Sequence, residues 1–325
     1  MARPDPELPL MFTRADARTA GFSAAQASRR AAGDWIRLRQ GWFTTRSDLA
    51  EETRWRAEIL ATVSSHRRPL VLSHAHAARA YRWPRPLGGW GPASFTSGSP
   101  PRRHRSGSWI NVADLQGDDV RYDGQVAVTA PGRTVVDCAR RLPARDALAI
   151  ADAAMRQGVP RDAVRAALVR QEGWPGIAKA RRVLALADGR RETAFESWSA
   201  WAFGEQGVRQ PLWQATLLDR EGVHLGRADA LWEKEGVVGE ADGRAKYRLK
   251  ALERRGVVDA EGLAAALDDE RRRERDLRAA GAVIVRWEPG DVLTTVRARR
   301  LAEQLQRELT EAGRARRFTG RVILL

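Results

Sequence analysis

Three of the carboxylates within residues 226–247, GRADALWEKEGVVGEADGRAKY, could act together. They are Asp229, Glu240 and Asp242. Carboxylates gathered at one place repel each other unless a cation offsets their charge, and their hard oxygen atoms suit Mg²⁺ or Mn²⁺. A metal ion held in this way is typical of sites that hydrolyse phosphodiesters.

Two short strands are predicted to position these acids. Residues 228–232 and 236–241 have the strand pattern and are joined by a polar turn. Successive side chains of a strand point to opposite faces, so Glu240 and Asp242 share one face. Asp229 on the neighbouring strand can be brought level with them.

A predicted helix containing Glu196 precedes these strands, and ERRRERDLRAAGAVIVRW at 270–287 follows them. With these flanks, residues 193–287 resemble the restriction-endonuclease-like nucleases of the PD-(D/E)XK class, in the branch similar to very short patch repair endonucleases. The resemblance implies an α/β nuclease domain in which Asp229 and Glu240 bind Mg²⁺ or Mn²⁺ and Glu196 is a supporting acid.

The chain departs from the family pattern at one catalytic position. The family has Lys two residues after the Glu, and this chain has Asp242 there, a recurring variant in this branch. Asp242 is therefore a further catalytic candidate, and Lys246 could supply a substitute cation.

Several basic residues surround the predicted site. Arg272, Arg273 and Arg286 match positions that would face phosphate or buttress the acids; alternatively, they form ion pairs on a solvated helix face. His224 precedes the strand and could shuttle a proton near pH 7, or it could be a surface loop residue. The helix before the strands is expected to bury Phe195, Trp198 and Ala202, with Glu196 beside them.

Residues 10–45 predict a small DNA-binding unit. Thr13 and Ser23 are expected to cap two helices that end at Gly21 and Gly33, and WIRLRQGWF predicts a β wing. The stretch resembles the winged N-terminal domain of type IV abortive-infection antitoxins. That resemblance places base or phosphate contacts at Gln26, Arg29, Arg30, Arg37 and Arg39; the alternative is a dimerisation or docking module.

The middle of the chain is less informative. It contains predicted helices, a loop-like basic segment at 84–108 and two strands, followed by helices from the 130s to the 180s. It also resembles the rest of the antitoxin architecture, which carries the motif Arg133, Thr134 and Asp137. We interpret that motif as a capping and salt-bridge device, and Cys138 beside it as a buried structural thiol.

The whole chain is predicted to be α+β, with a winged helix-turn-helix at 1–48, a mixed middle domain at 49–188 and the nuclease-like domain at 189–325. It has 325 residues and a net charge of +15. Almost all of the positive excess lies in residues 1–190, which points to a polyanion such as DNA. Arg-rich coding from a GC-rich genome would give the same excess.

The absence of a long apolar run and of a signal peptide predicts a cytoplasmic protein that does not contact membranes. A cognate toxin or a second copy of the chain is a further candidate partner. Two functions remain open: a metal-dependent DNA endonuclease, and a non-catalytic, antitoxin-like transcriptional regulator that keeps the nuclease fold as a scaffold.

Overall fold

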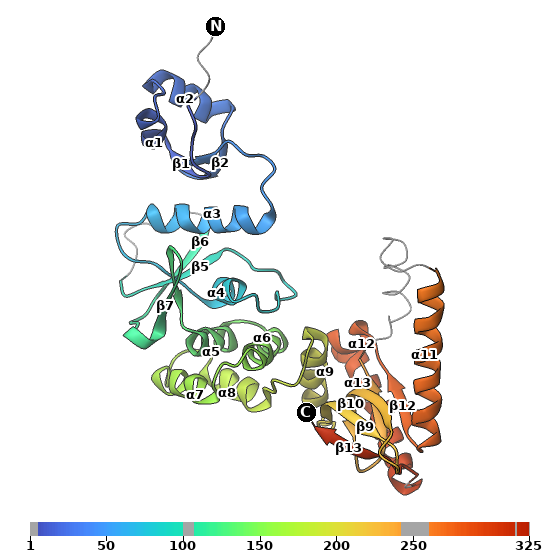
Figure 1. The fold of residues 1–325 in the computed structure, drawn as a ribbon. Helices are drawn as coiled ribbons and strands as arrows, with labels where there is room; N and C mark the ends of the chain where they lie inside the picture. The colour runs from blue at the N-terminus through green and yellow to red at the C-terminus, as the bar shows by residue number, and fades with distance from the viewer. Residues whose placement is uncertain (1–5, 100–106, 242–259, 316, 325) are drawn as a thin grey trace. The chain divides into compact units, whose positions relative to one another are not determined.

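The computed structural model describes residues 6–99, 107–241, 260–315 and 317–324. The described chain contains both helices and several sheets, which is compatible with the predicted α+β class (Figure 1). Two compact units are present: Met1–Ala77 with Trp90–Ala130, and Ala78–Gly89 with Pro131–Leu325. The three predicted domain ranges stay predictions. Within the described residues, no helix is long and apolar enough to cross a membrane.

The first two helices begin at the predicted caps. The hydroxyls of Thr13 and Ser23 each accept a hydrogen bond of 3.2 Å from the backbone N–H three residues further on. The side chains of Asp16 and Gln26 return a bond to the cap backbone, which completes two capping boxes. The helices are α1 (Arg14–Thr19) and α2 (Ala24–Gly33).

A small antiparallel sheet closes the N-terminal core. Its strands are β1 (Phe12–Thr13), β2 (Ile36–Arg39) and β3 (Trp42–Thr44), in the order β1-β3-β2. The ring of Trp35 meets Phe12 and Phe22 edge-on at centroid distances of 4.8 and 5.7 Å. The predicted helix–helix–hairpin order is therefore present, and its role on DNA stays a prediction.

A second sheet follows, with strand order β6-β5-β4-β8-β7. The prediction of a loop over residues 84–108 was wrong at Ala93–Ser97, which forms the buried strand β5 between β4 and β6. Both faces of this strand are covered, so its residues do not alternate between apolar and polar. Its small polar residues therefore resemble those of a loop. The other elements are α3 (Glu51–Ser64), β4 (Val71–Leu72), α4 (His74–Ala80), β6 (Ser108–Val112), β7 (Val120–Asp123) and β8 (Val126–Thr129).

Four helices follow the second sheet, at the start of the segment Pro131–Leu325. They are α5 (Pro131–Arg141), α6 (Ala144–Arg156), α7 (Arg161–Arg170) and α8 (Ile177–Leu186). In α5, Nε of Arg133 lies 3.0 Å from Oδ2 of Asp137, and both side chains are buried. The salt bridge supposed for this motif is thus confirmed, and its capping role stays a prediction. Cys138 is fully buried, as expected, and burial raises the pKa of its thiol well above the usual value.

The C-terminal sheet has the strand order β12-β11-β10-β9-β13. The predicted hairpin is present as the antiparallel strands β10 and β11, and β12 joins β11 in parallel after α11. The elements are α9 (Ala194–Glu205), β9 (Leu212–Leu218), β10 (His224–Trp232), β11 (Val237–Glu240), α11 (Ala260–Ala279), β12 (Val283–Arg286), α12 (Pro289–Leu293), α13 (Thr295–Ala315) and β13 (Arg321–Leu324).

Helix α9 packs on this sheet through Phe203, whose ring contacts Trp213, Trp232 and Trp287. The predicted buried stripe was wrong in part. Ala202 is buried, but Phe195 and Trp198 are only half-buried. The first two turns of α9 instead bury three polar side chains, Glu196, Ser197 and Ser199. Hydrogen bonds to other segments make this burial possible.

Candidate functional site

The two central acids lie where strands β10 and β11 stop pairing. Ala230 pairs with Gly239, and continuing the register by one residue places Asp229 across from Glu240. The backbone N–H of Ala241 donates a 2.9 Å hydrogen bond to Oδ2 of Asp229. The sequence-based expectation that Asp229 lies level with Glu240 therefore agrees with the backbone register. Asp242 and Lys246 lie outside the described residues.

Two arginines neutralise Glu240, which is 9% exposed. Its Oε1 accepts a 2.9 Å hydrogen bond from Nη1 of Arg273, and its Oε2 accepts one of 2.7 Å from Nε of Arg286. Arg273 also pairs with Glu270, and Arg286 with Glu274. Two guanidinium groups of the protein therefore already offset the charge of Glu240. Each oxygen still keeps a lone pair for a further ligand.

A glycine makes room for the first of these arginines. Gly226 in β10 has φ +138, and a Cβ built there would lie 2.6 Å from Nε of Arg273. Past this point Nη2 of Arg273 donates to the carbonyl of Arg227 at 2.8 Å. Any larger residue at position 226 would displace Arg273 from the path that leads to Glu240.

Glu196 is held firmly at the start of α9. Its Oε1 accepts from the hydroxyl of Thr193 at 2.8 Å, and its Oε2 accepts from the N–H of Glu192 at 3.0 Å and from Nε2 of Gln214 at 2.9 Å. The side chain is 3% exposed. Thr193 is the helix cap, so a local capping arrangement fixes this acid.

Asp229 carries the strongest electrostatic signature of the site. Burial, and after it the charges of Glu196 and Glu240, raise the pKa of Asp229 to about 6, although the N–H of Ala241 and the charge of Arg273 act to lower it. The carboxylates therefore leave an excess of negative charge at Asp229. A cation at this place would remove that excess.

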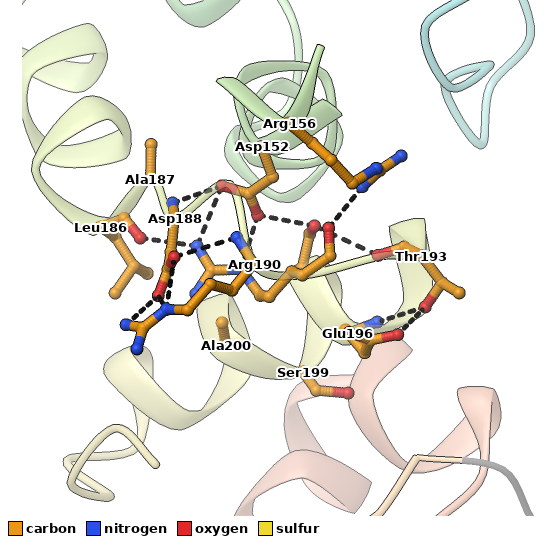
Figure 2. Close-up of polar contacts among 12 residues, drawn as sticks. Asp152, Arg156, Leu186, Ala187, Asp188, Arg190, Thr193, Glu196, Ser199 and Ala200 are labelled. Atoms are coloured by element: carbon orange, nitrogen blue, oxygen red, sulfur yellow. Dashed lines mark hydrogen bonds and ion pairs between the residues drawn. The ribbon is translucent and has the colours of Figure 1, made fainter. Parts of the chain in front are cut away.

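A buried polar network anchors the chain just before α9 (Figure 2). Asp152 of α6 accepts hydrogen bonds from Nε of Arg191 at 2.6 Å, from Nη2 of Arg191 at 3.0 Å and from the hydroxyl of Ser197 at 2.7 Å. The N–H of Asp188 donates to the same carboxylate at 2.7 Å. The network fixes the segment that leads into Glu196, and sequence reading missed it.

The remaining C-terminal candidates fall into two groups. Arg273 and Arg286 contact Glu240, as one alternative supposed, and they also form the ion pairs with Glu270 and Glu274 that the other alternative supposed. Arg272 is exposed and lies 3.7 Å from Asp269, which matches the alternative of a solvated helix face. His224 is the exposed first residue of β10 and not, as predicted, a residue ahead of the strand.

The N-terminal candidates differ in how firmly they are held. Oε1 of Gln26 accepts a 2.8 Å bond from the N–H of Ser23, so this side chain serves the helix cap. Nη1 of Arg39 donates to Thr62 of α3 at 2.7 Å, and Arg30 lies 3.6 Å from Asp34. Arg29 and Arg37 are exposed. Contacts of these five side chains with DNA stay predictions.

Asp229 and Glu240 provide some of the oxygen ligands that a divalent cation needs. Among the described residues, no three His, Cys, Asp or Glu side chains form a group that could hold a metal ion. Asp229 and Glu240 do supply two hard oxygen donors at the end of the hairpin pairing, and the excess negative charge lies on Asp229. These two acids fit Mg²⁺ or Mn²⁺, and a complete site needs further oxygen atoms.

Comparisons with known proteins give limited context. No family model matches the chain. It is similar to the uncharacterized proteins Rv2248 and MT2308 of two Mycobacterium tuberculosis strains, H37Rv and CDC 1551, each 37% identical over 113 residues. The match covers 34% of this chain and 41% of each relative, so the chain spans less than half the length of the curated relatives it matches. Neither name states an activity.

Proposed function

We propose that the C-terminal sheet carries a Mg²⁺- or Mn²⁺-dependent endonuclease site that hydrolyses DNA phosphodiesters. The observation that supports it is the placement of Asp229, with its raised pKa, beside Glu196 and Glu240 where the hairpin pairing ends. The resemblance to PD-(D/E)XK nucleases implies the same two ligands. A bound divalent cation would polarise a phosphate and make its bound water acidic.

Within this proposal each residue has a separate task. Asp229 and Glu240 hold the metal ion. The carboxylate of Glu196 adds a negative charge near Asp229, which favours a cation there. Arg273 and Arg286 orient Glu240 through its two oxygens. Arg273 also brings a positive charge to Glu240, and it could serve in place of the Lys that the family pattern has two residues after the Glu. That cation can offset charge that develops on the phosphate.

The proposed metal site has a thermal test. Adding Mg²⁺ or Mn²⁺ to the full chain should raise its melting temperature, because only the folded state presents the assembled oxygens. At a metal concentration 100 times the Kd, the stabilisation is about 2.7 kcal/mol. Glu240→Gln should abolish the metal-dependent rise, and Glu233→Gln in the turn should keep it. If neither Mg²⁺ nor Mn²⁺ changes the melting temperature of the wild-type chain, the proposed metal site is refuted.

DNA is the proposed partner because of the charge of +15 and the exposed arginines near the N-terminus. Arg29 on α2 and Arg37 on β2 are exposed, whereas Arg30 and Arg39 have contacts within the protein. Replacing Arg29 and Arg37 with Ala in the full chain should weaken binding to duplex DNA. The slope of log K against log salt should fall by about 2, since each phosphate contact contributes about 0.9.

Arg165→Ala is the matched control for this binding test, because Arg165 on α7 is an exposed arginine outside the N-terminal segment. Binding is measured by fluorescence anisotropy from low to moderate salt. An unchanged slope in the Arg29/Arg37 variant would show that these arginines do not contact phosphate.

The second candidate function is a non-catalytic, antitoxin-like DNA-binding regulator. One observation favours it: both oxygens of Glu240 already accept bonds from arginine, so this acid is neutralised without a metal ion. In that case the sheet is a scaffold and a cognate toxin or a second copy would be the partner. DNA binding without cleavage in any divalent metal would support this function.

A further inference from the structure

Gln214 occupies an unusual place beside the acid site. Its neighbours on β9, Trp213 and Ala215, pair with Ala230 and Ala228 of β10, which places Gln214 across from Asp229. Its φ is +55, a left-handed conformation that residues other than glycine seldom adopt inside a strand. Such backbone strain is found preferentially at functional sites.

The orientation of the Gln214 amide is fixed by one hydrogen bond. Nε2 donates to Oε2 of Glu196 at 2.9 Å, and a carboxylate can accept only from the nitrogen end. The other end is therefore the oxygen. Gln214 is 9% exposed, and its Oε1 is buried. Within the described residues this oxygen has no hydrogen-bond partner. A buried acceptor left without a donor is unfavourable, so this oxygen favours a bound water molecule or cation.

The surroundings indicate what that missing partner is. Gln214 bonds one acid, Glu196, and lies across from a second, Asp229, which is placed across from the third, Glu240. A divalent cation would satisfy a neutral amide oxygen and offset the carboxylates together. Amide oxygens are regular ligands of hard cations alongside carboxylates.

We propose that Oε1 of Gln214 is a third protein oxygen ligand of the divalent cation held by Asp229 and Glu240. This inference rests on the proposed metal site. It accounts for the unpartnered oxygen and for the shortage of acidic ligands among the described residues, because a glutamine completes the set. The bond from Nε2 to Glu196 then holds the oxygen in a fixed direction, as outer contacts do for metal ligands.

Two variants separate ligation from a purely structural role. Gln214→Met keeps the length of the side chain and removes both amide atoms. Gln214→Glu keeps an oxygen donor, adds a negative charge and loses the N–H that bonds Glu196. All three side chains meet the same backbone strain at φ +55. Ligation predicts weaker metal binding in the first variant and tighter binding in the second, whereas a structural role predicts no gain in the second.

The control is Gln210→Met. Gln210 also has an unpartnered, buried Oε1, and its Nε2 donates to the carbonyl of Ala200 at 2.9 Å. It lies ahead of β9, and its amide bonds a backbone carbonyl of α9 where that of Gln214 bonds the acid Glu196. We expect water to satisfy its oxygen.

Calorimetric titration of the full chain with Mn²⁺ provides the measurement. We expect Gln214→Met to raise the Kd by about tenfold or more, Gln214→Glu to lower it, and Gln210→Met to leave it unchanged. Wild-type affinity in Gln214→Met, or weaker binding in Gln214→Glu, would overturn the role of Gln214 while leaving the metal site intact. If the wild-type chain binds no Mn²⁺, the proposed metal site fails, and this inference fails with it.

Discussion

Asp152→Ala should lower the free energy of unfolding by about 3–5 kcal/mol, the range for breaking a buried ion pair by removing one partner. Asp152 and Arg191 are each 1% exposed, and Asp152 accepts both bonds from that guanidinium. Without the carboxylate, Arg191 keeps a buried charge, and the hydroxyl of Ser197 and the N–H of Asp188 lose their acceptor. Urea denaturation followed by fluorescence measures the loss.

Two controls define this result. Asp162→Ala removes an exposed acid of α7 that lies 3.8 Å from Arg165, and it should change stability by less than about 1 kcal/mol. Asp152→Leu combined with Arg191→Met removes both charges and should recover much of the lost stability. A small effect of Asp152→Ala would show that the network in Figure 2 does not hold α9 in place.

Asp229→Asn should stabilise the metal-free protein at neutral pH. The pKa of Asp229 is about 6 in the folded protein, above its ordinary value of 3.8, so folding favours the protonated acid. The stability that this proton contributes is complete below pH 4 and is lost as the pH rises through 6. Above pH 6 the ionised group therefore costs up to about 3 kcal/mol, at 1.36 kcal/mol for each unit of pKa shift.

Asparagine cannot ionise, so the variant should gain most at pH 7.5 and little at pH 4. Unfolding in urea at both pH values, without metal, gives the comparison. Glu233→Gln in the exposed turn between β10 and β11 is the control and should show no such pH dependence. Equal stability of wild type and Asp229→Asn at pH 7.5 would mean that burial and the neighbouring acids do not raise the pKa of Asp229 in the folded protein.

The sequence predicted the parts of the fold that depend on neighbouring residues. Thr13 and Ser23 cap their helices through bonds to residues three positions away, and the hairpin that carries Asp229 and Glu240 is joined by a short polar turn. Such local arrangements are visible in the order of residue types. The two acids of the hairpin could therefore be proposed as neighbours from the strand pattern and the turn alone.

Contacts between distant segments could not be predicted in the same way. Asp152 and Arg191 are 39 residues apart, and each looks like an ordinary surface charge in the sequence. Gln214 is distinguished only by its backbone and by the strand beside it. Phe195 and Trp198 have the residue types of a core but are half-buried, because the polar residues Glu196, Ser197 and Ser199 find partners there.

Cleavage of supercoiled plasmid by the full chain in Mg²⁺ or Mn²⁺ tests the nuclease proposal most directly. The wild-type chain should convert the plasmid to nicked or linear DNA, and it should do so only when a divalent metal is present. Asp229→Asn and Glu240→Gln should each remove this activity, and Glu233→Gln should retain it. A wild-type chain that binds the plasmid but leaves it supercoiled in both metals would contradict the nuclease and favour the regulator.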